Sequence, residues 1–272
     1  MNLTPATDMR TTLDPADVQA LTDRIEAAQK GATAIPKLTE DFPGMTLGDG
    51  YAVQLGLLER WLKEGRRQIG WKAGLTSQAK MIQMGVDVPT VGFLLADMAR
   101  PEGSVIATDD LVHPRVECEV AFVLKSALGG RDCSRADVLA ATDFVVPAIE
   151  VIDSRFSGFK FDLPSVVADN SSSARYVTGG RALEPEALAL DTLGVVLEKN
   201  GEPVAMGASA AVMGHPADGV ALLVRVLAEL GRELPAGSFV MSGGITEAIA
   251  VKPGDFVCAR FQDLGSVAVR FG

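Results

Sequence analysis

The sequence is poor in the residues that carry disulfide, zinc or histidine chemistry. Its 272 residues include only three cysteines, two histidines, two tryptophans and two tyrosines. Cys118, Cys133 and Cys258 form no C-x-x-C pair and leave an odd thiol, which favours a reducing compartment over a disulfide or zinc scaffold. With only His113 and His215, catalysis led by histidine has few candidates.

Positive charge is also scarce, because 25 basic residues face 35 acidic ones and the formal net charge is −10. A polyanion such as DNA, or an anionic membrane surface, would be repelled over most of the molecule. The N-terminus carries no apolar signal-like core, and no stretch reaches the roughly 18 uninterrupted apolar residues of a spanning helix. We therefore expect a cytoplasmic protein with no nucleic-acid and no membrane partner.

Three common functional signatures are missing. The sequence contains no G-x-G-x-x-G after a strand, no G-x-x-x-x-G-K-[ST] and no G-x-S-x-G. Dinucleotide binding, P-loop chemistry and serine hydrolysis therefore have no support.

Two helices are expected in the N-terminal region, residues 1–67. The first follows the potential cap Asp14 and ends at Gly31, and the second begins at Thr46 and ends near Gly65, a position suited to a left-handed cap. In the second helix, apolar residues recur at spacings of three and four; they are Leu47, Tyr51, Leu55, Leu58 and Leu62. Both helices need a partner surface, so we expect this region to pack on the rest of the chain.

The remainder, residues 68–272, is expected to be a β-rich catalytic domain. Short β-like runs alternate with Gly and Pro, and Asn200-Gly201 predicts a tight hairpin. Two helices interrupt these runs, one opening at Ser134 with Asp137 as capping partner and one over residues 216–230. The predicted fold class is α+β.

Residues 115–125, RVECEVAFVLK, predict a strand with two carboxylates on one face. Five apolar residues alternate with Glu117 and Glu119, so the period of two places both glutamates on the opposite face, with Cα atoms ~7 Å apart. Such a face is often solvated, but Ala121 and Val123 farther along it favour a partly enclosed cavity. Two like charges there would need a proton or a metal.

A third acid stands among apolar neighbours in FVVPAIEVIDSRF, residues 144–156. Glu150 and Asp153 fall on opposite faces by the period of two. Because buried carboxylates are seldom unpaired, Glu150 is either a metal ligand or a salt-bridge partner. Three oxygen ligands without His or Cys would suit Mg²⁺ or Mn²⁺, which retain waters that a chelating substrate displaces.

Positive and polar groups could complete such a site. Lys72 stands between Gly70 and Gly74, which permit close approach of a ligand, although a lysine on a strand is also an ordinary surface residue. The polar run ADNSSS at residues 168–173 predicts either an anion-binding loop or a simple turn. SGGIT at residues 242–246 is a second possible anion nest.

These segments together resemble the fumarylacetoacetate hydrolase superfamily, in its hydratase and decarboxylase branch of catechol meta-cleavage pathways, over essentially the whole chain. Within the branch, IDSRFSGFKFDLPSVVADNSSS and SGGITEAI resemble the decarboxylases more than the hydratases. The remaining matching segments are GWKAGLTSQAKMIQMGVDVPTVGFLLADM, HPRVECEV, VVPAIEVIDSRF, VADNSSSARYVTGG, GHP and PGDFVCARFQDLGSVAVRFG.

The resemblance implies a mixed β-roll surrounded by helices and a divalent metal, Mg²⁺ or Mn²⁺, held by Glu-x-Glu and a later acid. Its metal ligands correspond to Glu117, Glu119 and Glu150, and its active-site lysine to Lys72. Its Asp-Asn-x-Ser loop corresponds to Asp169, Asn170, Ser171 and Ser172, where Ser171 replaces the usual Ala. Arg155, Lys160 and Arg175 are candidates to hold a distal substrate carboxylate, and an apolar pocket that destabilises this carboxylate is the alternative.

The implied activity is decarboxylation of 2-oxohex-3-enedioate to 2-hydroxypenta-2,4-dienoate and CO₂. Hydration of 2-hydroxypenta-2,4-dienoate is the nearest alternative, and hydrolysis of acylpyruvate-type carbon–carbon bonds or a non-catalytic partner role are others. We expect a small 2-oxo dicarboxylate as substrate, a homo-oligomer, and association with a sister hydratase.

Overall fold

The computed structural model describes residues 9–76 and 89–272, and its N-terminal part is helical as predicted. Helix α1 (Pro15–Lys30) begins after Asp14, whose carboxylate accepts a hydrogen bond from the Asp17 amide, and ends at Gly31. Helix α2 (Leu47–Lys63) begins with a capping box and is followed by Gly65 at φ 89°. The expected inward position of Leu62 is wrong, because its side chain is 40% exposed and the buried face passes through Trp61 instead.

Eight strands form the larger sheet, in the order β2-β1-β10-β5-β6-β7-β3, with β11 beside β5. Pairing is mixed: β1 runs parallel to β10, whereas β5 and β6 are antiparallel over most of their length. Its strands are β1 (Gln68–Gly74), β2 (Thr90–Leu95), β3 (Ala99–Arg100), β5 (Arg115–Leu124), β6 (Thr142–Ile152), β7 (Ser173–Thr178), β10 (Phe239–Met241) and β11 (Ile249–Ala250).

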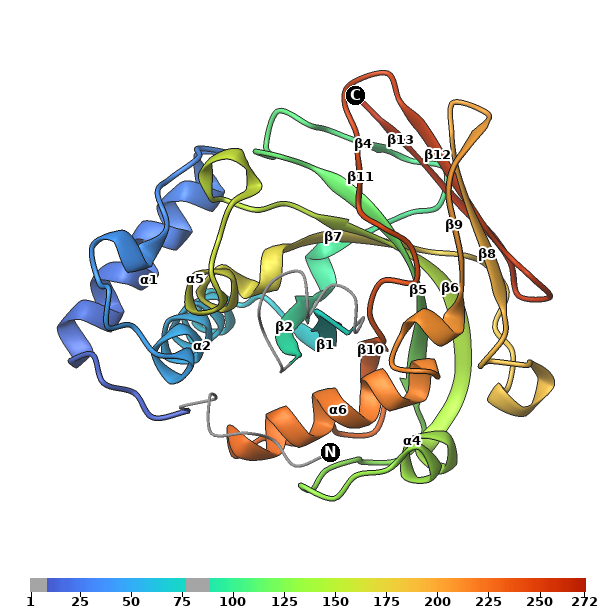
Figure 1. Cartoon of the computed structure of the whole chain (residues 1–272), viewed down its shortest axis with the longest axis horizontal. Helices are drawn as coiled ribbons and strands as arrows, with labels where there is room; N and C mark the ends of the chain where they lie inside the picture. The colour runs from blue at the N-terminus through green and yellow to red at the C-terminus, as the bar shows by residue number, and fades with distance from the viewer. Residues whose placement is uncertain (1–8, 77–88) are drawn as a thin grey trace.

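The smaller sheet has five strands in the order β4-β13-β12-β8-β9. The predicted Asn200-Gly201 turn joins β8 to β9, with φ values of 57° and 88°. These strands are β4 (Val105–Ile106), β8 (Gly194–Lys199), β9 (Glu202–Ala208), β12 (Phe256–Phe261) and β13 (Gly265–Phe271). The larger sheet is curved, and the smaller sheet packs against its outer side through contacts of β12 and β13 with β6 (Figure 1).

Three described helices, rather than the predicted two, interrupt the strands after residue 68. Helix α4 (Arg135–Ala141) has the expected capping box of Ser134 and Asp137, and α6 (Pro216–Glu229) follows the cap His215. The unpredicted helix α5 (Leu163–Ala168) is capped by Asp162 and has a proline in its first turn, which are helix-start signals. Its six residues are too few for a clear helical period.

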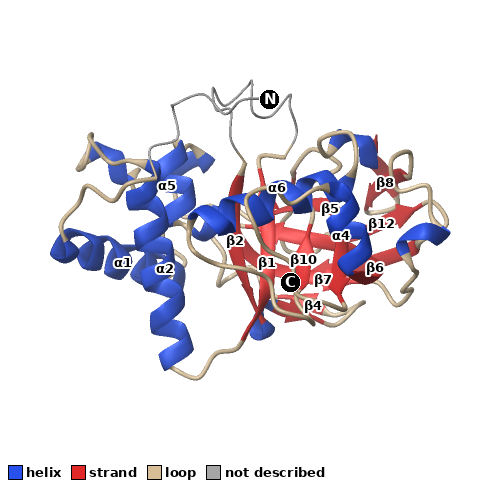
Figure 2. Cartoon of the chain, turned by 90° about the horizontal axis from the view of Figure 1, so that it is seen from below, coloured by secondary structure: helices blue, strands red, loops and turns tan. Residues whose placement is uncertain are grey.

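Helices α1, α2 and α5 lie together at one end of the molecule, with the sheets at the other (Figure 2). Gln54 of α2 fixes this contact by donating hydrogen bonds to the carbonyl oxygens of Val91 and Val167, at 2.8 and 2.9 Å. The N-terminal region therefore packs on the rest of the chain as expected. The α+β class is confirmed.

Helix α6 covers one side of β1 and β2. By length and composition alone, Ser209–Glu229 is the one described segment apolar enough to cross a membrane, but 56% of its 18-residue apolar window is buried inside the fold. It buries the predicted apolar residues Val220, Leu223 and Val224. This segment is therefore a core helix.

Candidate metal centre and active site

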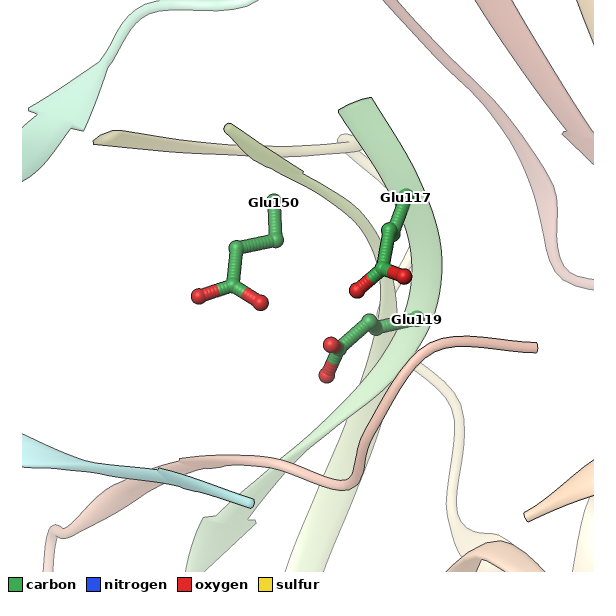
Figure 3. A group of neighbouring side chains, drawn as sticks. All are labelled: Glu117, Glu119 and Glu150. Carbon is green, nitrogen blue, oxygen red and sulfur yellow. The ribbon is translucent and has the colours of Figure 1, made fainter. Parts of the chain in front are cut away.

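Glu117, Glu119 and Glu150 come together on the concave side of the larger sheet (Figure 3). Glu117 of β5 lies opposite Glu150 of β6 in the strand register, and Glu119 follows on the same face of β5. One carboxylate oxygen from each lies within 4.8 Å of the others. The three side chains are 8%, 0% and 0% exposed, so the predicted convergence of these acids in an enclosed space is confirmed.

Among the described residues, few groups compensate Glu119 and Glu150. The Gly243 amide donates a hydrogen bond of 2.8 Å to Glu119 Oε2, so the predicted anion nest at residues 242–246 meets one of the chain's own carboxylates. Among the described residues, Glu119 Oε1 and both oxygens of Glu150 have no hydrogen-bond partner. Gly244 leaves room for Glu117, because a Cβ atom there would lie 2.9 Å from its carboxylate carbon.

The pKa values of the buried acids reflect this deficit. Burial raises the pKa of Glu119 well above its usual value, and the neighbouring carboxylate of Glu150 raises it further. Burial also raises the pKa of Glu150, although Lys72 opposes the shift. Unpartnered carboxylate oxygens in a buried cluster fit a hard divalent cation, whose charge would favour their ionised forms. These three residues could therefore hold Mg²⁺ or Mn²⁺.

Lys72, on β1, reaches the same cluster. Its Nζ atom lies 3.2 Å from Glu150 Oε2 and donates a hydrogen bond of 3.2 Å to the Ser171 carbonyl oxygen. Burial alone would lower the pKa of this ammonium, but the carboxylates, Glu150 foremost, outweigh burial and raise it. Lys72 is therefore a fixed positive charge at the wall of the site.

The loop that contacts Lys72 has unusual backbone conformations. Asn170, Ser171 and Ser172 have φ values of 50°, 50° and 59°, in the left-handed region that costs non-glycine residues about 1–3 kcal/mol each. The Asn170 amide group hydrogen-bonds both backbone polar groups of Phe93 on β2, and Ser171 Oγ donates to the Val91 carbonyl. These contacts hold the Ser171 carbonyl toward Lys72.

Two residues expected to bind substrate contact each other behind this loop. The Arg155 amide and Nε atom donate hydrogen bonds of 3.0 and 2.5 Å to the Asp169 carboxylate, and its Nη2 atom donates to the Asp169 carbonyl. Burial raises the pKa of Asp169 to about 6, against the effect of Arg155. Neither residue lines the cavity at the glutamates, and Lys160 is exposed outside it.

That cavity has a volume of about 320 Å³ and is lined by both polar and apolar side chains. The polar lining includes Lys72, Glu117, Ser171 and Ser172, and the buried Ser172 hydroxyl has no hydrogen-bond partner among the described residues. The apolar lining consists of Ile152, Phe159, Phe161, Val166 and Ala248.

Arg115 also lines this cavity and was missed by the sequence analysis. The signal was available, because Arg115 precedes Glu117 by two residues and therefore shares its face of β5. The apolar lining could not be anticipated, since it combines residues from β6, from α5 and from the segments after β6 and β10.

Comparison with known proteins shows the family to which this chain belongs. The family model for the C-terminal part of fumarylacetoacetate (FAA) hydrolase matches residues 72–271. The chain belongs to the fumarylacetoacetate hydrolase family. One segment of the sequence resemblance, residues 77–88, lies outside the described residues.

Individual members of the family are also similar over nearly the whole chain. A 4-oxalocrotonate decarboxylase from Pseudomonas sp. (strain CF600) is 52% identical over 263 residues, covering 97% of this chain and 100% of the relative. A 2-keto-4-pentenoate hydratase from Paraburkholderia xenovorans (strain LB400) is 39% identical over 246 residues, covering 90% of this chain and 91% of the relative.

Among solved structures of the family, the 4-oxalocrotonate decarboxylase from Pseudomonas putida G7, complexed with magnesium and adipate, superposes with a TM-score of 0.95. It is 50% identical, and the match covers 97% of this chain and 100% of that one. The expected mixed β-roll of the family is thereby confirmed.

Proposed function

We propose that this chain is a metal-dependent carboxy-lyase that converts 2-oxohex-3-enedioate, also called 4-oxalocrotonate, to 2-hydroxypenta-2,4-dienoate and CO₂ in aromatic meta-cleavage degradation. The observation that carries the proposal is the buried cluster of three converging carboxylates beside Lys72, at a cavity that Lys72 and Glu117 both line. The similarity to 4-oxalocrotonate decarboxylases at 50–52% identity supports this substrate over those of hydratases at 34–41% identity.

The substrate itself provides the electron sink. When the bond between C5 and C6 breaks, its electron pair forms the C4–C5 double bond, the former C3–C4 π pair moves to C2–C3, and the carbonyl π pair moves to the C2 oxygen. Mg²⁺ or Mn²⁺, bound by Glu117, Glu119 and Glu150, supplies a Lewis acid for the negative charge that develops at the 2-oxo acid. No carbonyl-bearing cofactor is needed for this electron flow.

Lys72 is the proposed catalytic residue. Its ammonium is held by Glu150 and the Ser171 carbonyl, so it is fixed before substrate enters. We infer that Nζ donates a hydrogen bond to the developing C2 oxygen and delivers the proton that converts the dienolate to the enol product. A preoriented charge of this kind stabilises the transition state more than the neutral ground-state carbonyl.

The residues of the polar loop, 169–172, have two roles in the proposed function. Ser171 and Ser172 line the cavity and face the substrate, whereas Asn170 and Asp169 act by holding the loop through Phe93 and Arg155. Lys160 is exposed and lies in sequence between the cavity-lining residues Phe159 and Phe161, and its proposed part is to attract the substrate dianion.

Product analysis tests this function. The chain is incubated with 2-oxohex-3-enedioate and, separately, with 2-hydroxypenta-2,4-dienoate, each with Mg²⁺ and with EDTA, and the products are identified by mass spectrometry. We expect CO₂ and the dienoate from the first substrate, with turnover abolished by EDTA and restored by Mg²⁺. Formation of 4-hydroxy-2-oxopentanoate without CO₂ release would instead assign the hydratase activity.

The wider setting is proposed on less direct grounds. A cytoplasmic location fits the three free cysteines, two of them buried. A homo-oligomer, and association with a sister hydratase, fit the exposed apolar side chains Val105 and Met206 on the smaller sheet, which are 61% and 72% exposed. Light scattering of the chain alone and mixed with the hydratase distinguishes these assemblies from a monomer.

A further inference from the structure

Arg115 is the second cationic side chain among the described residues that line the active-site cavity, after Lys72. It stands two residues before Glu117 on β5, so their Cα atoms are ~7 Å apart on the same face of the strand. Its backbone pairs with Ile152 of β6 on one side and Ala250 of β11 on the other. Strands on both sides therefore fix its position relative to the glutamates.

The guanidinium of Arg115 has no carboxylate partner in the part of the chain that the structure describes. Its Cζ atom lies 4.2 Å from the centre of the Phe159 ring. Stacking on a ring leaves the N–H edges of a guanidinium free for a bidentate contact with a carboxylate. The two arginines considered for the substrate from sequence differ in this respect, because Arg155 and Arg175 form ion pairs with Asp169 and Asp110.

The ring under Arg115 is held in an unusual backbone conformation. Gly158 and Phe159 have φ values of 65° and 59°, and for a bulky residue this region is strained. The Phe159 ring packs against Phe161 and His113, with ring centres 5.8 and 6.5 Å apart. Strained residues of this kind concentrate at ligand sites, where the surrounding structure enforces them.

We propose that Arg115 is a specificity-determining residue, whose guanidinium receives the distal carboxylate of a six-carbon 2-oxo dicarboxylate. The inference rests on the proposed function for the identity of this substrate. The two carboxyl carbons of an extended six-carbon chain are about 6 Å apart, given bonds of about 1.5 Å. Because Arg115 and Glu117 line the same cavity, a ligand of this length can extend from the glutamates, where the 2-oxo acid end would lie, toward the guanidinium.

The charge change in the reaction determines which kinetic constant Arg115 affects. The distal carboxylate is an anion in the bound substrate and leaves as neutral CO₂, so its ion pair with Arg115 weakens as the bond breaks. Contacts of this kind favour substrate binding more than the transition state. Replacement of Arg115 should therefore raise KM by about 10- to 100-fold, the worth of a charge-assisted hydrogen bond, and change kcat by only a few fold.

Two unreactive ligands isolate this contact. 2-Oxoadipate has the 2-oxo acid and the distal carboxylate but lacks the alkene that accepts electrons, and 2-oxohexanoate lacks the distal carboxylate as well. Calorimetry with saturating Mg²⁺ should show that Arg115→Gln weakens 2-oxoadipate binding by about 10- to 100-fold and 2-oxohexanoate binding by less than about threefold. Arg115→Lys, which keeps the charge but loses the fork, should recover part of the affinity.

Arg270 provides the matched control, because its guanidinium also stacks on a phenylalanine, with Cζ 4.8 Å from the centre of the Phe256 ring, outside the cavity. Arg270→Gln should change neither affinity.

The proposal would be overturned if the unaltered chain bound the two ligands equally, or if Arg115→Gln lost equal affinity for both. If Arg115→Gln folds poorly, the same comparison in Arg115→Lys decides. Discrimination between the ligands without CO₂ release from 2-oxohex-3-enedioate would remove the decarboxylase function and leave the carboxylate site standing.

Discussion

Buried acids at the two ends of the molecule are treated in opposite ways. In the helical end, the Asp49 carboxylate accepts hydrogen bonds from the amides of Thr12, Leu13 and Thr46, at 2.6, 2.9 and 2.8 Å. In the sheet, Glu119 accepts one amide hydrogen bond, and Glu150 accepts none from the described amides, with Lys72 Nζ 3.2 Å from its Oε2 atom. The helical end therefore supplies its buried acid with fixed hydrogen-bond donors, whereas the sheet end supplies few to its buried acids.

The pKa values follow this difference. Burial would raise the pKa of Asp49, but its backbone donors outweigh burial and lower it to about 2. At the sheet, burial dominates and the pKa values of Glu119 and Glu150 rise. A carboxylate with a full set of donors stabilises the fold, whereas one without them has an unmet requirement for a cation. The first is a structural acid, and the second is the kind of acid that we propose as a metal ligand.

The strongest test of this contrast is Glu119→Gln. The amide is nearly isosteric and retains an acceptor for the Gly243 amide, but it removes one of three anionic ligands. We expect kcat for decarboxylation to fall by about 1000-fold, or about 4 kcal/mol, while the free energy of unfolding of the metal-free chain is unchanged or increased. Steady-state CO₂ release and urea unfolding measure the two quantities.

Glu59 on the exposed face of α2 provides the control, and Glu59→Gln should leave both quantities unchanged. The contrast would fail if metal-free Glu119→Gln lost as much free energy of unfolding as its activation free energy for decarboxylation rises. Glu119 would then be a structural acid.

Lys72→Ala should give the next largest effect, because it removes the buried ammonium that contacts Glu150. We expect kcat to fall by about 100-fold, or about 2.7 kcal/mol, with a smaller change in KM. Lys72→Arg keeps a positive charge and should recover only part of the rate. The larger guanidinium cannot take the position of the ammonium that donates a hydrogen bond to the Ser171 carbonyl oxygen. Near-normal kcat in Lys72→Ala would assign this lysine to structure.

Much of the site was predictable because it follows from a period of two. The alternation in β5 placed Glu117 and Glu119 on one face, and the apolar neighbours of Glu150 indicated a buried acid with a special role. Capping signals likewise located the helices that begin after Asp14 and Ser134. These features depend on residues within a few positions of one another, so local chemistry determines them.

The remaining parts of the site depend on contacts between distant segments. The hydrogen bond from Lys72 to the Ser171 carbonyl joins residues 99 positions apart, and it requires left-handed conformations that Asn and Ser rarely adopt in succession. The pairing of Arg155 with Asp169 similarly depends on how the chain turns after β6. No periodicity encodes these turns, so sequence suggested substrate contacts where the structure has an internal ion pair.

A divalent cation should stabilise the sheet end and leave the contribution of Asp49 unchanged. Mg²⁺ at 100 times its dissociation constant should add about 2.7 kcal/mol to the free energy of unfolding at neutral pH, and this gain should vanish in Glu119→Gln. Because the pKa values of Glu119 and Glu150 are raised, protons compete with the cation and the affinity should fall as pH decreases. Calorimetry in buffers of different ionisation enthalpy measures the released protons. A Mg²⁺ affinity that does not change with pH would contradict the inference that Glu119 and Glu150 have too few hydrogen-bond donors.

The smallest expected effect concerns the structural acid itself. Asp49→Asn should lower the free energy of unfolding by about 2 kcal/mol at pH 7, since its backbone donors lose a charged acceptor, without changing Mg²⁺ affinity. The folded-state pKa of about 2 lies below the ordinary value of 3.8, so this stabilisation is present above pH 3.8 and is lost as pH falls toward 2. Urea unfolding at pH 7 and near pH 3 should therefore show the gap between the unaltered chain and Asp49→Asn narrowing. The exposed control Asp132→Asn should show no gap at either pH. A constant gap for Asp49→Asn would mean that the geometry of the cap, rather than its charge, stabilises the helical end.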